Sequence, residues 1–186
     1  WLALGIGAYI AFTLSSFPAG TAYAWFAPQG VSFSGIDGTL WSGRAAAGAV
    51  GELALRDIRW QVRPTRLLIG RLAAEVEARL SDGFVSANVS ASPTRVALSE
   101  VRGSTSIPTL GSVLPVSGVR GDASVNFDEL ELAGGALTKI LGELRLAKLE
   151  VAPFVSSGSR DLLSIGDYTV RFLESDGNGI NASFVD

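Results

Sequence analysis

The apolar and polar positions of this chain follow two different patterns, and the change falls near residue 30. Residues 1–17, WLALGIGAYIAFTLSSF, carry no charge, and the uncharged stretch continues as far as Asp37. A helix of about 20 apolar residues crosses the hydrocarbon core of a bilayer, and Pro18 would end or kink such a helix. The pattern therefore predicts one N-terminal transmembrane helix, with residues 1–27 forming the anchor and its interfacial segment.

Two other interpretations of this segment stay open. Ala22, Tyr23 and Ala24 have the small-x-small spacing of a signal-peptide cleavage site. A helix buried in a protein core is the third option. The apolar run is longer than a usual signal core and has no polar face, which favours the anchor, with the downstream domain on the far side of the membrane.

From Val31 onward the dominant period is two residues, as in strands with one buried and one solvated face. The stretches RLAAEVEARL at residues 71–80 and FVSANVSAS at residues 84–92 alternate in this way. The intervening Asp82 and Gly83 are a strong turn signal, so these two strands should form an antiparallel hairpin. DYTVRF at residues 167–172 and the alternating residues after the turn 176–179 predict a second hairpin.

At several points the alternation slips by one residue. Leu53 and Leu55 are followed by Ile58 and Trp60, a spacing of three where two is expected. A β-bulge inserts one residue, restores the buried face and bends the strand. Similar slips occur between Leu98 and Val101, between Phe127 and Leu130, and between Leu146 and Leu149. The sequence therefore predicts an all-β, mainly antiparallel, curved and bulged sheet over residues 28–186.

Two smaller features accompany the strands. Residues 51–64 and 142–153 share a Gly-Glu-Leu-x-Leu start, a slip and a closing proline, which suggests an internal duplication with chance as the competing explanation. Short helices are expected first at residues 109–114 and 136–141, within the irregular parts.

Composition excludes most side-chain chemistry. The 186 residues include no cysteine, histidine or methionine, so thiolate and imidazole metal sites, the corresponding nucleophiles and disulfides are ruled out. A net charge of −3 and a pI of about 5.0 argue against nucleic acid as a partner.

No hydrolase, P-loop or dinucleotide motif occurs, and no spacing singles out a serine to act with Lys139 or Lys148. The acidic residues near 174–178 lack the further oxygen ligands of a calcium loop, and a hairpin turn explains them better. We therefore predict no enzymatic activity, no cofactor and no metal.

A basic stretch runs from Arg56 to Arg71. Arg59 and Arg63 are expected on the polar face of one strand, where they would contact anionic lipid head groups or an acidic partner. The alternative is a solvated strand face on which the arginines pair with neighbouring carboxylates.

The segment GIDGTLWSGRA, at residues 35–45, places a tryptophan among three glycines. On a strand, Trp41 and Gly43 would share a face, leaving room for the indole, so we expect Trp41 to be a packing anchor. Four features follow one another along the chain: an anchor segment, GIDGTLWSGRA, LRDIRWQVRPTRLLIGRL and SIGDYTVRF. The order resembles the type II secretion system protein N family, whose signature residues match Gly38, Thr39, Leu40, Trp41, Gly43, Trp60 and Pro64.

The resemblance implies an accessory, non-catalytic subunit in the export of folded proteins across the outer membrane. It implies a single-pass protein of the inner membrane, with its main domain in the periplasm in contact with other secretion subunits and its final strands beyond Asp186. Periplasmic proteins of the AsmA type carry a similar GTLWSG element, so a β-groove that binds or transfers lipid is the alternative function.

Overall fold

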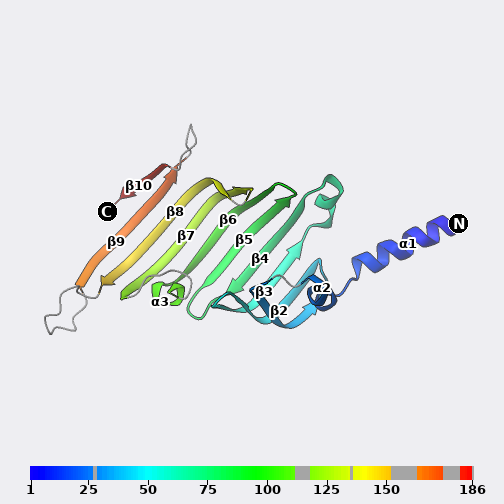
Figure 1. Cartoon of the computed structure of the whole chain (residues 1–186), viewed down its shortest axis with the longest axis horizontal. Coiled ribbons are helices and arrows are strands. Elements are labelled where there is room, and N and C mark those ends of the chain that lie inside the picture. The colour runs from blue at the N-terminus through cyan, green and yellow to red at the C-terminus, as the bar shows by residue number, and fades with distance from the viewer. Residues whose placement is uncertain (27–28, 112–117, 135, 152–162, 174–180, 186) are drawn as a thin grey trace.

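A single open sheet of ten antiparallel strands makes up most of the molecule, and the strands are adjacent in chain order from β1 to β10 (Figure 1). The computed structural model describes residues 1–26, 29–111, 118–134, 136–151, 163–173 and 181–185. The strands are β1 Val31–Gly38, β2 Ser42–Val50, β3 Leu53–Val62, β4 Leu72–Arg79, β5 Phe84–Ser92, β6 Arg95–Ser106, β7 Val119–Ala133, β8 Ala136–Val151, β9 Leu163–Leu173 and β10 Asn181–Val185. The predicted all-β antiparallel class is confirmed.

The predicted slips are β-bulges. Three non-glycine residues with positive φ occupy them, namely Asp57 at 48°, Glu100 at 51° and Lys148 at 53°. The register shifts beside each of these positions, and it also shifts between Phe127 and Glu129. Because each bulge absorbs one residue, the apolar side chains return to the same face of the sheet.

The two faces of the sheet differ sharply in chemistry. One row of paired residues crosses all ten strands on the polar face: Asp37, Arg44, Arg59, Glu77, Ser86, Arg102, Asn126, Glu143, Arg171 and Ser183. The adjacent row on the other face reads Ala78, Val85, Gly103, Val125, Leu144, Val170 and Phe184 from β4 to β10. By this register, the paired charged residues of the described strands lie on the polar face.

The hairpin of β4 and β5 forms as predicted, with Ala78 opposite Val85 and a turn closed by the Leu80 N–H donating to the Gly83 carbonyl at 2.9 Å. The pairing of β9 with β10 is also confirmed, while the turn at residues 176–179 lies outside the described residues. The helix predicted at 136–141 is wrong: these residues begin β8, where cross-strand pairing with β7 overrides local preference. Of the helix predicted at 109–114, only α3 Ile107–Leu110 is described.

The N-terminal residues form two helices, α1 Leu2–Ser15 and α2 Ala19–Phe26. Among the described residues, we find no helix with both the length and the apolar character needed to cross a membrane. Helix α2 lies against the outer edge of β1. There the Tyr23 hydroxyl donates to the Val31 carbonyl at 3.1 Å and accepts from the Phe33 N–H at 3.2 Å. These two bonds occupy edge groups of β1 that would otherwise be open to another strand.

Candidate contact surfaces

The signature residues meet at one corner of the sheet, where the N-terminal segment joins the first three strands. Gly38 pairs with Gly43, and Gly43 pairs with Trp60 on the next strand. The Trp60 indole N–H donates to the Thr39 carbonyl at 3.2 Å, and the Leu40 N–H donates to the Phe17 carbonyl at 2.9 Å. The arrangement is structural, since it ties four segments together through backbone groups.

The sequence predicted that Trp41 and Gly43 lie on one strand, and this prediction is wrong. Residues 39–41 are the turn between β1 and β2, and the Trp41 carbonyl accepts from the Val62 N–H at 2.6 Å. It is the Trp60 ring that covers Gly43, at the position where a β-carbon would stand. The glycine requirement at this position therefore comes from the Trp60 ring and the Asp37 carbonyl oxygen, and Trp41 is half-buried.

Pro64 ends β3 and begins a short 3₁₀ helix, η1 Pro64–Ile69, which closes on Gly70 in the left-handed conformation at φ 69°. A proline in the first turn has no N–H to lose and cannot continue the ladder, so the strand must end here. This change of direction separates Arg63, at the start of the connection, from Arg59 on the strand.

Arg59 lies on the polar face between Arg44 of β2 and Glu77 of β4. Arg44 forms an ion pair with Asp37 at 2.9 Å, and all four side chains line a cavity of about 440 Å³. Among the described residues Arg59 itself makes no ion pair within 4.0 Å. Its guanidinium is exposed and is available for a contact.

The two lysines of the chain make structural contacts. Lys139 pairs with Glu129 at 2.8 Å, and the Lys148 amine lies 3.8 Å from Asp122. Within the described ranges no three acidic side chains gather closely enough to hold a metal ion. The acidic residues near 174–178 lie outside the described residues.

Sequence reasoning missed one polar cluster. Asp82, assigned only to a turn, accepts from the Thr105 hydroxyl at 2.7 Å, the Thr109 hydroxyl at 3.0 Å and the Ser106 N–H at 3.1 Å. The hydrogen bonds from Ser106 and Thr105 lower the pKa of this carboxyl from 3.8 to about 2. No sequence signal pairs Asp82 with residues more than twenty positions away.

The fold and its surfaces define a protein built on one open β-sheet, with a charged face, an uncharged apolar face and a corner that ties the sheet to an apolar N-terminal segment. The family model described as "Type II secretion system (T2SS), protein N" matches residues 29–183, and the chain belongs to this family. The predicted resemblance is confirmed.

The match to a curated relative is local. The type II secretion system protein N of Vibrio cholerae serotype O1 is 39% identical over 49 residues, which cover 26% of this chain and 19% of that protein. The matched part thus spans about one fifth of the relative's length. No solved structure gives a significant match.

Proposed function

We propose that the chain is an accessory, non-catalytic subunit of the type II secretion system that presents its sheet to other secretion subunits. Residues 1–27 would anchor it in the inner membrane, and residues 28–186 would lie in the periplasm. The observation that carries this proposal is the family match over nearly the whole sheet. The uncharged N-terminal sequence and the tie between Phe17 and Leu40 at the signature corner support an anchor held close to the sheet.

The polar face around Arg59 is the proposed contact surface for these subunits. Its row contains both acidic and basic groups between Asp37 and Arg171, and exposed charges of this kind favour selectivity and orientation over raw affinity. Arg59 has no ion-pair partner within the described residues, so a partner carboxylate would gain a charge-assisted bond without breaking one.

Site-specific photo-crosslinking in cells tests this role. A photoreactive residue at Arg59 should capture a secretion subunit, whereas the same residue at Glu52, in the β2–β3 turn, should not. Capture of no secretion subunit from position 59, or equal capture from both positions, would count against the proposal.

A second candidate function, lipid binding on the apolar face, is favoured by a specific observation. Within the part of the chain that the structure describes, no second layer of strands covers the uncharged face, and α3 lies on part of β7 to β9. Among the described residues, no large side chain is fully buried. An apolar surface of this extent left in water is costly, and phospholipid acyl chains are an occupant with matching chemistry.

Native mass spectrometry of the detergent-extracted chain distinguishes this candidate. The parent chain should retain phospholipid, and Val89→Glu, which puts a charge on the apolar face of β5, should release it. Ser90→Glu places the same charge on the polar face one residue away and should not. Absence of bound phospholipid in the parent, or equal loss from both variants, would sink the idea.

A further inference from the structure

The connection between β3 and β4 forms an exposed corner of the sheet in which arginines flank apolar side chains. We call Arg63, the helix η1, Gly70 and Arg71 the η1 tip; it lies at the outer corner where β3 ends and β4 begins (Figure 1). Leu67 is 41% exposed and Ile69 is 63% exposed. These two aliphatic residues lie two positions apart in one short helix, and with the arginines they give the tip both apolar and basic exposed surface.

Backbone hydrogen bonds close both ends of the tip, so its exposed side chains stand on a defined backbone. The Arg63 N–H donates to the Ala73 carbonyl at 2.8 Å, closing the base of the connection. The Gly70 N–H donates to Leu67 at 2.9 Å and the Arg71 N–H donates to Arg66 at 3.0 Å, closing its end. A preorganised surface loses little entropy when it binds.

Three guanidinium groups accompany the apolar pair. Arg63, Arg66 and Arg71 line one cavity of about 260 Å³, together with a single carboxylate, Glu100. The Glu100 carboxylate accepts a hydrogen bond from the Asn88 amide at 2.8 Å. None of the three arginines forms an ion pair with a described residue. The cavity therefore carries an excess of positive charge.

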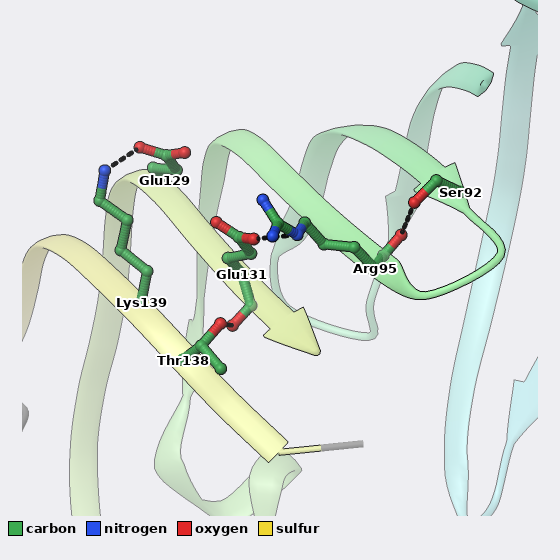
Figure 2. A network of polar contacts seen from close by, with 6 residues as sticks. All are labelled: Ser92, Arg95, Glu129, Glu131, Thr138 and Lys139. Carbon is green, nitrogen blue, oxygen red and sulfur yellow. Dashed lines mark hydrogen bonds and ion pairs between the residues drawn. The ribbon is translucent and has the colours of Figure 1, made fainter. Parts of the chain in front are cut away.

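The acidic residues on the neighbouring strands do not neutralise this charge. Glu129 and Glu131 line the adjoining cavity with Arg71, but both carboxylates already have basic partners (Figure 2). Arg95 pairs with Glu131 at 2.7 Å, and Lys139 pairs with Glu129 at 2.8 Å. The tip arginines are thus left for an external anion.

We propose that the η1 tip binds the surface of an anionic phospholipid bilayer. Guanidinium groups bind phosphate oxygens in pairs, and Arg63, Arg66 and Arg71 would take lipid phosphates at the head-group level. Leu67 and Ile69 would enter the boundary between head groups and acyl chains, as apolar residues of interfacial segments do. The arginines match the phosphate layer of a leaflet, and the aliphatic side chains match the acyl chains beneath it. An acidic protein surface would contact only the arginines.

This surface is separate from the proposed secretion contact at Arg59. It requires no secretion subunit, so its failure leaves the proposed function standing, and failure of the crosslinking experiment leaves the tip unaffected. The basic stretch from Arg56 to Arg71 is therefore split between two surfaces, because Arg63 belongs to the tip and Arg59 to the polar face.

The absence of cysteine makes a direct test practical, because one introduced cysteine is a unique labelling site. The full chain carrying Thr65→Cys, labelled with an environment-sensitive fluorophore, is reconstituted into vesicles of phosphatidylcholine with or without about 30% phosphatidylglycerol. Thr65 is an exposed residue of η1, and labelling it leaves Leu67 and Ile69 intact. The control label is Glu52→Cys at the opposite end of β3.

The label at position 65 should shift to the blue and be quenched by lipid-borne quenchers in anionic vesicles, while the label at position 52 stays aqueous. Combining Arg66→Glu with Arg71→Glu should weaken this response by at least tenfold in lipid concentration, since each basic residue near such a surface contributes about a fivefold factor. Leu67→Ser with Ile69→Ser should abolish the quenching, whereas Arg120→Glu on β7 should leave it unchanged.

Three results would overturn the proposal. The first is an aqueous label at position 65 in anionic vesicles, and the second is equal burial in neutral and anionic vesicles. The third is burial that appears only when secretion proteins are added, which would make the tip a protein contact. Circular dichroism of each variant confirms that the sheet is intact before its response is compared.

Discussion

Two regions of the apolar face are covered in different ways. The glycine region, around the buried residues Ala45, Ile58 and Ala78 of β2 to β4, is filled by side chains of the sheet itself. The α3 region, around Ile107, Ala123 and Leu149, is filled by a helical turn that lies on β7 and β8. Both regions shield apolar surface in a sheet that no second layer of strands covers among the described residues.

In the glycine region, large side chains lie across glycines on the paired strand. The Trp60 ring covers Gly43, and a β-carbon at Gly48 would stand 2.5 Å from the Phe33 ring and 2.8 Å from the Ile58 side chain. Such close contacts exclude any larger residue at these positions. The packing is local to β1, β2 and β3 and depends on their register.

In the α3 region, a remote carboxylate holds the cover in place. Asp82, in the turn between β4 and β5, binds Thr105, Ser106 and Thr109 around the start of α3. This fixes the position from which Ile107 reaches the apolar face. One region is therefore sensitive to volume and the other to charge.

The largest expected effect is that of Ile58→Ala, because Ile58 is 4% exposed and lies at the centre of the glycine region. Its loss leaves a cavity between strands that cannot close, so the free energy of unfolding should fall by about 2–4 kcal/mol. Ile107→Ala should cost less, since α3 is a single turn that can resettle on the sheet. Urea unfolding of the detergent-solubilised chain measures both, and an equal or greater loss for Ile107→Ala would contradict the comparison.

Gly43→Ala should come next. The added methyl group would meet the Trp60 ring and stand 2.7 Å from the Asp37 carbonyl oxygen, which is backbone and cannot move aside. Overpacking of this kind costs about 1–3 kcal/mol. Gly20→Ala in α2 is the matched control, because nothing lies within 4 Å of its β-carbon position. A control as destabilised as Gly43→Ala would show that steric contact with Trp60 and Asp37 is not the cause.

The sequence predicted the elements that repeat and missed those that depend on distant partners. The bulges at Asp57, Glu100 and Lys148 were accessible because a slip in apolar spacing records which face each residue occupies. The sequence could not show that Trp60, and not Trp41, covers Gly43. That contact depends on where the turn between β1 and β2 falls and on the register of β3.

The contact surfaces show the same division. The arginine stretch was visible in the sequence, and the strand period placed Arg59 on the polar face. The period could not show that Pro64 turns the chain away and gathers Arg63, Arg66 and Arg71 around one cavity. Nor could it show that Asp82 reaches α3, since their contact arises only when β4, β5 and β6 are paired.

The bulges allow a smaller effect to be compared between the regions. Asp57 in the glycine region and Lys148 near the α3 region both have positive φ. Lysine tolerates this conformation less well than aspartate, so Lys148→Gly should raise the free energy of unfolding by up to about 1 kcal/mol and Asp57→Gly by less. The Lys148 N–H keeps its bond to Asp167 in the variant. Destabilisation by Lys148→Gly in the same urea assay would show that its side chain contributes more than the backbone strain costs.

The smallest effect should come from Asp82→Asn, and it should depend on pH. The Asp82 pKa is lowered from 3.8 to about 2 in the folded chain, so its contribution is fully present above about pH 4 and is lost as the pH falls through about 2. Because the carboxylate is exposed, the variant should lose less than about 1 kcal/mol at neutral pH. Hydrogen exchange at residues 105–110 should quicken in the parent between pH 4 and pH 2, after correction for the intrinsic pH dependence, and should already be fast in the variant.

Asp128→Asn on β7 is the control, because no described residue forms an ion pair with Asp128. Amide hydrogens of α3 and of the glycine region could instead exchange at the same rate at every pH. The two regions would then unfold as one cooperative unit, and the carboxylate would not hold α3 separately.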